Sequence, residues 1–367
     1  MHSSSLTHRT RRPTVVASLV LLLALAGCEN YDAANFDHLD PASALQHAAG
    51  AHDARGGGAA AALPDGRVLL VGGQSPFTSP VMPKTAELYD PAADAWHAVA
   101  EPLWYHTNPA AAAVADGRVL VVGSETSSTV PQHHLAEVYN PATNQWAGVP
   151  GADIQAVHPA ALALPGTMRV LVSCNFGLVE FDLSTNSQRV IPGGWNGAFS
   201  SALARLPDGR VLAIFPENWS LFDPVADSVV ARGALPRPHY EGAAVAGPDG
   251  RVYVGGGRAG EAPNTAPQRV YEIFDPIQRT FGDPLQIDGR LYSGTGYSSQ
   301  GMFQAGGRLV YMSRESGSDL LDLERSQAIY GLPIPGGGAS CQLPDGRVFT
   351  ARGGQSVVTD LTKYPRP

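Results

Sequence analysis

Three side chains that can exchange a proton or bind an anion occupy one repeated position in this chain. Arg55, His106 and His239 each stand eight residues before the start of a similar phrase. Histidine gains and loses a proton near neutral pH, and arginine recognises carboxylates and phosphates. If the repeats place these side chains around a common axis, they could shape a pocket for a polar ligand.

Further candidate residues lie in the connections between the predicted strands. Aromatic side chains with polar neighbours suit the recognition of a sugar or a peptide. We therefore predict a ligand-binding set that also contains Trp104, His158, Trp195, Trp219, Glu241, Tyr297 and Arg352. The alternative is that the histidines cap backbone carbonyls and have only a structural role.

The spacing of the histidines does not favour a metal site. The chain has no His-x-x-x-His spacing, and the adjacent His133 and His134 would point to opposite sides of a strand. The recurring Asp-Gly pairs lack further oxygen ligands at alternating positions, so they are interpreted as turns and not as calcium loops. We expect neither a metal nor a cofactor.

The elements that would position these residues are repeated along the chain. The phrase LPDGRVLLVGG at residues 63–73 combines a two-residue Asp-Gly turn with an apolar, β-branched strand. Six related phrases occupy residues 114–124, 164–174, 206–216, 247–257, 304–314 and 343–354. Their average spacing of about 47 residues lies in the range of β-propeller blades.

A second repeated phrase lies between the copies of the first. In AELYDPAADAW at residues 86–96, an alternating apolar run leads to Asp-Pro, a few polar residues and an aromatic residue. Related phrases start at residues 136, 178, 220, 271 and 320. Each phrase predicts a hairpin, so each unit should hold four strands.

Four-stranded units at this period resemble the kelch repeat, and the resemblance covers nearly all of the chain after its N-terminal segment. It is carried by double glycines such as Gly72-Gly73, by the stretch Tyr89-Asp90-Pro91, and by the trailing Trp96 and Trp146. The third, fourth and sixth copies lack the double glycine and the tryptophan. The resemblance implies an all-β fold, a β-propeller.

Residue size agrees with strands that converge on an axis. The predicted first strands at residues 56–63, 109–114 and 241–247 are rich in Ala and Gly, which need little space. Large aromatic residues stand at the end of the second phrase, and we predict that Trp96, Trp146 and Phe281 fill the gaps between neighbouring units.

The last unit has only three predicted strands, and an open ring would leave two unpaired sheet edges. The sequence HLDPASALQHAA at residues 38–49 aligns with LYDPAADAWHAV at residues 88–99. We predict that residues 45–48 supply the missing strand. Residues 37–367 would then form one seven-bladed kelch-type β-propeller with four-stranded blades, the last blade closed by an N-terminal strand.

The first residues have the pattern of a secretory signal. Three arginines precede an apolar run at residues 15–26 that is too short to span a membrane as a helix. Leu25-Ala26-Gly27-Cys28 resembles the lipobox of bacterial lipoproteins. That resemblance implies a signal peptide over residues 1–27, lipidation of Cys28, and a tether over residues 28–36. An ordinary signal peptide with an incidental cysteine is the alternative.

Localisation and partners follow from the anchor and the composition. Glu29 after the lipidated cysteine implies the outer membrane, in a bacterium that has one, with the propeller outside the cytoplasm. A formal charge of −8 over 367 residues argues against a nucleic-acid partner. Cys174 and Cys341 fall on units that are not neighbours, so no disulfide is expected. We expect a monomer that contacts the membrane only through its anchor.

Enzyme activity is a separate question. The kelch-type galactose oxidases need a copper site that is partly supplied by an extra C-terminal domain, and we expect no such domain in this chain. The kelch-type sialic acid epimerases suggest another possibility, in which Arg55, Arg258 or Arg352 holds an acidic sugar and Glu241 or a histidine moves a proton. The Gly-x-Ser-x-Gly, Walker and dinucleotide-binding motifs are absent.

Two hypotheses for function therefore stand at this point. The first is a lipid-anchored envelope propeller that binds a protein or glycan ligand through the loops at one face. The second is a carbohydrate-active enzyme similar to the kelch-type sialic acid epimerases.

Overall fold

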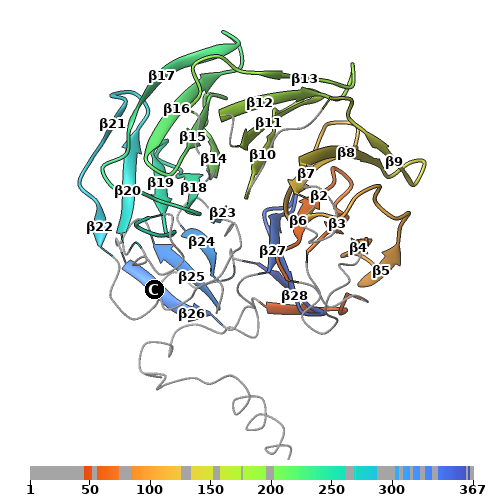
Figure 1. Ribbon diagram of the computed structural model, residues 1–367. Helices are drawn as coiled ribbons and strands as arrows, with labels where there is room; N and C mark the ends of the chain where they lie inside the picture. Colours follow the sequence, from red (N-terminus) through yellow and green to blue (C-terminus); the bar gives the residue numbers. More distant parts are fainter. Residues whose placement is uncertain are drawn as a thin grey trace, which may run out of the picture. The chain divides into compact units, whose positions relative to one another are not determined.

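The computed structural model describes the parts of the chain that hold most of the repeated phrases (Figure 1). The described residues are 45–51, 56–73, 84–124, 134–151, 158–174, 177–195, 202–260, 268, 270–286, 302–305, 309–314, 317–322, 327–332, 338–360 and 363. All of these belong to one compact unit, Asp40–Tyr364, and the terminal residues form a second unit. The predicted signal peptide, Cys28 and tether lie outside the described residues, as do Arg55 and Tyr297.

The first sheet follows directly from the first two repeated phrases. Its strands in order are β2 (Ala59–Ala62), β3 (Val68–Val71), β4 (Ala86–Asp90) and β5 (Ala95–Ala98). The strands pair antiparallel, with Ala62 opposite Val68 and Val68 opposite Tyr89. The apolar β3 is buried along its whole length, whereas the outer strand β5 ends in two exposed residues.

Six further antiparallel sheets repeat this plan within the described residues, and we number all seven in chain order. Sheets two to seven consist of β6 (Thr107–Ala113), β7 (Val119–Ser124), β8 (His134–Asn140) and β9 (Gln145–Gly148); β10 (Ala160–Ala163), β11 (Arg169–Cys174), β12 (Gly177–Asp182) and β13 (Ser187–Val190); β14 (Ala202–Arg205), β15 (Val211–Ile214), β16 (Asn218–Asp223) and β17 (Ser228–Ala234); β18 (Ala243–Ala246), β19 (Val252–Gly255), β20 (Val270–Asp275) and β21 (Thr280–Phe281), with β22 (Leu285–Gln286) also paired to β20; β23 (Met302–Ala305), β24 (Leu309–Arg314), β25 (Gly317–Asp322) and β26 (Gln327–Leu332); and β27 (Ala339–Gln342), β28 (Val348–Arg352), β29 (Gln355–Thr359) and β1 (Leu45–Ala48). The described part of the chain contains no α-helix, and no helix there is long and apolar enough to cross a membrane.

The N-terminal strand β1 belongs to sheet seven, as the alignment of the phrases predicts. It pairs antiparallel with β29, and Leu45 lies opposite Thr359 while Ala48 lies opposite Ser356. Sheet seven is therefore built from both ends of the described chain. This pairing gives it a fourth strand and covers the edge of β29.

In sheets one, two, four, five and seven, the turn between the first two strands is one residue longer than the predicted two-residue turn. In sheet one, Leu63 N–H donates to the carbonyl of Arg67 at 2.8 Å, and Gly66 N–H donates to the carbonyl of Leu63 at 3.0 Å. The loop thus contains three residues, and Gly66 has the positive φ of +91°. Three-residue hairpin loops with a left-handed glycine are a common alternative to the two-residue turn.

An ion pair inside this turn explains why aspartate and arginine recur on either side of the glycine. Asp65 accepts hydrogen bonds from the backbone N–H of Arg67 at 3.0 Å and from its Nε at 2.9 Å. The same two bonds recur between Asp208 and Arg210 and in three other sheets. The phrase is therefore a self-contained turn that needs no bound ion.

These turns should make the protein lose stability in acid. The side-chain hydrogen bond from Arg210 lowers the pKa of the Asp208 carboxyl, against a smaller upward effect of partial burial. In Asp65, Asp249 and Asp345, partial burial raises the pKa, but the bonds from the neighbouring arginine outweigh it and the net pKa is lowered. Because the folded carboxyls protonate at lower pH than the unfolded ones, their stabilisation is present above the ordinary aspartate pKa and is lost as pH falls through the lowered values.

Urea denaturation midpoints between pH 5 and pH 2.5 will measure this loss. We expect the midpoint to fall with pH, and to fall less steeply in Asp208→Asn than in the wild type. An identical pH dependence in the variant would show that this turn does not contribute.

In sheets one and two, the tryptophan of the second hairpin forms a hydrogen bond with the connection that leads into the sheet. Trp146 Nε1 donates to the carbonyl of Ala100, in the connection from sheet one to sheet two, at 2.7 Å. Trp96 Nε1 donates in the same way to the carbonyl of Ala49, directly after β1, at 2.5 Å. The link from β1 to sheet one therefore has the same hydrogen bond as the link from sheet one to sheet two.

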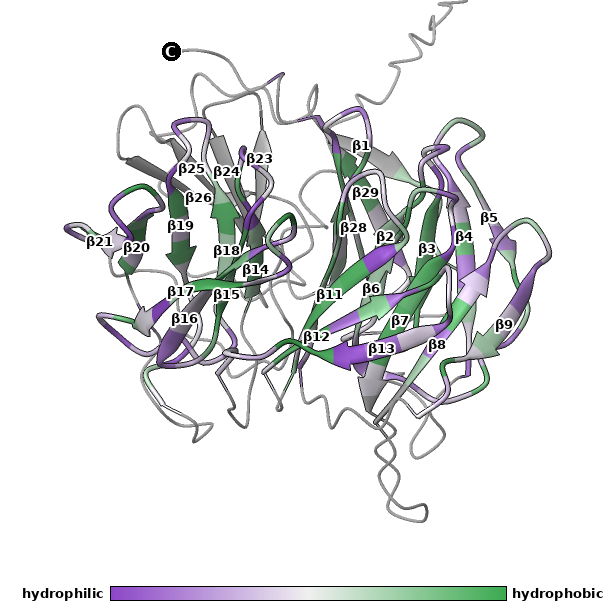
Figure 2. Cartoon of the chain, turned by 90° about the horizontal axis from the view of Figure 1, so that it is seen from above, coloured by the Kyte–Doolittle hydropathy of each residue, from purple (hydrophilic) through white to green (hydrophobic). Residues whose placement is uncertain are grey.

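The hydrophobic cores lie between neighbouring sheets. Separate clusters join sheets seven and one, one and two, two and three, three and four, and four and five. As predicted, Trp96 packs between two sheets, with its ring 5.1 Å from Tyr89 and 6.0 Å from Phe349 of sheet seven. The strands that supply these clusters are apolar. In Figure 2, β3 and β7 are coloured hydrophobic, whereas the outer strand β13 is largely hydrophilic.

The first strands of successive sheets lie against one another. Contacts join β27 to β2, β2 to β6, β6 to β10, β10 to β14, β14 to β18, and β18 to β23. The double glycine at Gly72-Gly73, directly after β3, permits the close approach of the chain segment that leads into β6. A Cβ on Gly72 would lie 2.6 Å from the carbonyl oxygen of His106, and Gly73 N–H donates to that same oxygen. The glycines are therefore required by packing as well as by their positive φ.

Candidate functional site

The first strands enclose a cavity of about 700 Å³. It is lined by six first strands, β2, β6, β10, β14, β18 and β27, whose side chains there are mostly alanine. This agrees with the predicted convergence of small residues. A cavity of this volume falls within the usual size range of small-molecule sites, roughly 300–1,000 Å³.

One repeated position stands where these strands begin. Gly57, Asn108, His158 and Glu241 each lie six residues before the start of a turn phrase, and all four have positive φ, of 67°, 44°, 51° and 60° respectively. Gly57 and Asn108 line the cavity, as does Pro159, the residue after His158. The fold thus imposes a left-handed backbone at this position, which glycine adopts without cost and glutamate does not.

His158 and Glu241 meet although their sheets are not neighbours. The Nε2 atom of His158 lies 3.7 Å from Oε1 of Glu241, and Arg258 Nη2 lies 2.7 Å from the same oxygen. We call His158, Glu241 and Arg258 the charged trio. Pro159, next to His158, and Ala243, two residues after Glu241, line the cavity, whereas the three trio residues are not among its described lining residues. The trio therefore lies beside the cavity.

The trio is held in place by the backbone and is largely buried. Arg258 forms two backbone hydrogen bonds with Tyr240, the neighbour of Glu241, at 2.8 and 3.1 Å. The exposed fractions of the side chains are 7% for His158, 6% for Glu241 and 14% for Arg258. Burial lowers the pKa of His158, while Glu241 opposes this shift and Arg258 adds to it. The net effect favours a neutral imidazole beside a paired carboxylate and guanidinium.

The predicted histidines eight residues before the turn phrases, His106 and His239, lie outside the charged trio. His106 is buried, and its Nε2 is 2.5 Å from Oε1 of Glu137 in the third strand of its own sheet. His239 is fully buried and its Nδ1 is 2.8 Å from the carbonyl of Gly256. Both side chains thus hold their own sheet together, which corresponds to the structural alternative, and neither joins His158 in one site.

Trp195 and Trp219 of the predicted set contact residues other than the trio. Trp219 is buried between sheets four and five, with its ring 4.8 Å from Phe274. Trp195 donates from Nε1 to the carbonyl of Trp219 at 2.9 Å, and the guanidinium of Arg232 lies over its ring. These two residues support sheet four and do not form part of an open aromatic mouth.

Two further predicted residues, Trp104 and Arg352, lie near the ends of strands. Trp104 is half-buried and covers Gly148 at the end of β9, where an added Cβ would lie 2.5 Å from the indole ring. Arg352 is exposed at the end of β28, close to the cavity-lining Gly338. Of the predicted residues that the structure describes, Trp195 and Trp219 contact each other within sheet four, and His158 and Glu241 meet across sheets. Their partner Arg258 was named only with the epimerase alternative.

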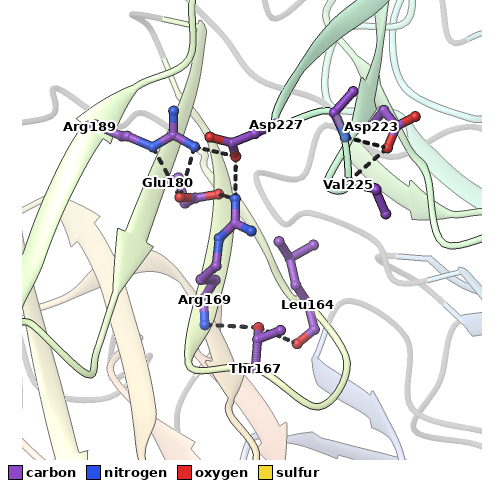
Figure 3. Close-up of polar contacts among 9 residues, drawn as sticks. Leu164, Thr167, Arg169, Glu180, Arg189, Asp223, Val225 and Asp227 are labelled. Atoms are coloured by element: carbon purple, nitrogen blue, oxygen red, sulfur yellow. Dashed lines mark hydrogen bonds and ion pairs between the residues drawn. The ribbon is translucent and has the colours of Figure 1, made fainter.

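A second charged cluster joins sheets three and four and has a different character (Figure 3). The guanidinium groups of Arg169 and Arg189 both contact the carboxylates of Glu180 and Asp227. Asp227 belongs to the last hairpin of sheet four, so these ion pairs tie the two sheets together. Arg189 and Asp227 are 42% and 48% exposed, which identifies the cluster as a surface network.

Comparison with known proteins identifies the fold. No family model matches this sequence, and no curated protein matches it. Among solved structures, the chain is similar to a fungal alcohol oxidase of the AA5 family in complex with copper, with 13% sequence identity and a TM-score of 0.51. The match covers 83% of this chain and 62% of that one, so this chain spans less than two thirds of the oxidase. The likeness and the repeated four-stranded antiparallel sheets show a β-propeller-like all-β fold.

Because the oxidase structure contains copper, the side chains of this chain are compared with the requirements of a copper site. Among the residues that the structure describes, no three histidine, cysteine, aspartate or glutamate side chains are grouped so that they could hold a metal ion. The trio offers one imidazole and one carboxylate, and its guanidinium would repel a cation. Cys174 and Cys341 are buried in separate cores, and burial raises the pKa of Cys341 to about 12. The described residues therefore do not fit a copper site.

Proposed function

We propose that this protein is a lipid-anchored, seven-bladed kelch-type β-propeller of the bacterial cell envelope that binds a glycan or protein ligand beside its central cavity. The seven sheets would be its blades, and contact between β23 and β27 would close the ring. The unbroken series of first-strand contacts from β27 to β23 supports this arrangement, as does the pairing of β1 with β29. Cys28 would carry the lipid anchor, and the propeller would stay outside the cytoplasm.

The charged trio is the observation that supports a ligand site. Buried charges cost free energy unless their hydrogen-bonding groups are satisfied, so such groups rarely persist without a role. The fold itself asks only for a left-handed backbone at this position, and Gly57 meets that need in sheet one. The strained Glu241 and its partners therefore support a function that goes beyond folding.

Capture from a solubilised envelope fraction will test this proposal. The immobilised protein should retain a discrete protein or glycan, and Glu241→Gln should reduce its recovery at least tenfold, because the carboxylate that organises the trio is lost. Glu217→Gln is the matched control, since Glu217 is exposed and its carboxylate accepts a hydrogen bond from Tyr240 Oη at 3.1 Å. Equal recovery by the wild type and Glu241→Gln would refute binding at the trio.

A carbohydrate-active enzyme is the second candidate. The observation that favours it is the His158–Glu241 contact of 3.7 Å, in which a neutral imidazole next to a carboxylate could accept and return a proton. Incubation with a panel of sugars, monitored by NMR, would reveal epimerisation or oxidation. Turnover that is unchanged in His158→Ala would count against this candidate.

A further inference from the structure

The charge balance of the trio restricts the ligands that it can accept. Arg258 contributes one positive charge, and Glu241 neutralises it at 2.7 Å. His158 lies in a buried position that favours the neutral imidazole. The three side chains therefore carry no net charge, and the only buried guanidinium among them already has its counter-ion.

The hydrogen-bonding capacity of the trio is only partly used by the described residues. Oε1 of Glu241 takes the contacts from both His158 and Arg258, and no described residue donates to Oε2. The Nε–H of Arg258 is buried and has no acceptor among the described residues. A ligand that offers a donor and an acceptor close together would satisfy both atoms.

The neighbouring cavity wall adds little charge. Among its described lining residues, Arg205 is the one charged side chain, and the others are small, apolar or uncharged, with Asn108 at the same repeated position as the trio's His158 and Glu241. The described wall therefore offers a cationic ligand no charged partner and an anionic ligand only Arg205. Hydroxyl groups, which both donate and accept, match the combination of Glu241 Oε2 and Arg258 Nε.

We propose that the charged trio binds a neutral sugar unit, with adjacent hydroxyl groups on Glu241 and Arg258. This inference rests on the proposed binding function and narrows its ligand to a glycan with neutral residues. One hydroxyl donates to Glu241 Oε2, and its neighbour accepts from Arg258 Nε. An acidic sugar is disfavoured, because its carboxylate would face Glu241 and could pair with Arg258 only by displacing that counter-ion.

Matched pairs of sugars will test this directly. The probes are galactose with galacturonate, glucose with glucuronate, and mannose with mannuronate, which differ only in a hydroxymethyl or carboxylate group at C6. Each is titrated into the full chain and followed by saturation-transfer NMR. We expect at least one neutral sugar to bind more tightly than its uronate, to weaken at least tenfold in Glu241→Gln, and to bind unchanged in Glu217→Gln.

Each other outcome would overturn the inference. Tighter binding of a uronate, lost in Arg258→Gln, would assign an acidic ligand while leaving binding at the trio intact. Binding of none of the six sugars would remove the neutral-sugar assignment, and the envelope capture experiment would then judge the proposed function independently. The comparison of neutral sugars with uronates needs only the wild type, so it does not depend on the folding of a variant.

Discussion

A chain that begins at Gly50 should unfold roughly 10 °C below a chain that begins at Asp40. The shorter chain lacks β1, so β29 loses its outer partner, and Val357 and Val358, each only 2% exposed, come to lie on an open edge. Trp96 also loses the carbonyl of Ala49 as its acceptor. Lost ladder bonds of about 1 kcal/mol each and a buried indole N–H without an acceptor together cost about 3–5 kcal/mol.

Thermal unfolding followed by circular dichroism will measure this difference. The chain that begins at Asp40 is the control, because it removes the preceding residues and keeps all of β1. It should unfold within about 2 °C of a chain that begins at Cys28. Equal melting temperatures for the chains that begin at Asp40 and at Gly50 would mean that the β1 pairing does not stabilise the fold.

Replacing Glu137 by alanine should cost about 3–5 kcal/mol of unfolding free energy, because hydrogen-bond donors around a fully buried carboxylate lose their acceptor at about 1–3 kcal/mol each. The carboxylate is fully buried, lies 2.5 Å from His106 Nε2, and accepts the backbone N–H of Leu103 at 2.8 Å. The substitution removes the acceptor of the buried His106 Nε2 and of the backbone N–H groups of Leu103 and Trp104. Glu137→Gln should cost less, because its amide oxygen can still accept one of these bonds.

Urea denaturation at pH 7 will give the free energies. Asp227→Ala is the control, because it also removes a carboxylate from an ion-pair cluster, but one that is 48% exposed. Its loss should stay within about 1 kcal/mol. If Asp227→Ala and Glu137→Ala lost the same stability, burial of the His106–Glu137 pair would not be the source of its effect.

Local patterns in the sequence predicted most of the strands, because each hairpin is encoded in adjacent residues. The Asp-Gly phrase predicted a turn at the right place, and only the loop length was wrong, since Pro64 adds a third residue before the ladder resumes at Arg67. The alignment of residues 38–49 with a later hairpin also predicted the strand β1 and its sheet. Such features depend on periodicity and turn chemistry, which are visible without any tertiary structure.

The candidate site was harder to predict. Histidines recur at a repeated position that does not form the site, and residue type alone therefore pointed to the wrong position. The position eight residues before each turn phrase holds His106 and His239, but their side chains bond within their own sheets. The position six residues before it holds His158 and Glu241. A glycine and an asparagine at the same position in the first two copies are a signal of a left-handed backbone, and this signal could have directed attention there.

The sequence by itself thus determined the repeat, the strands, the turns and the aromatic residues between sheets, because these follow from neighbouring residues and from alternation along a strand. Only the tertiary structure decided that Glu241 meets both His158 and Arg258. That contact depends on the order of the first strands, on the left-handed backbone at their entrances, and on the bridge between Tyr240 and Arg258. The order of the first strands is not a property of a single repeat, so no local pattern could reveal that His158 and Glu241 meet.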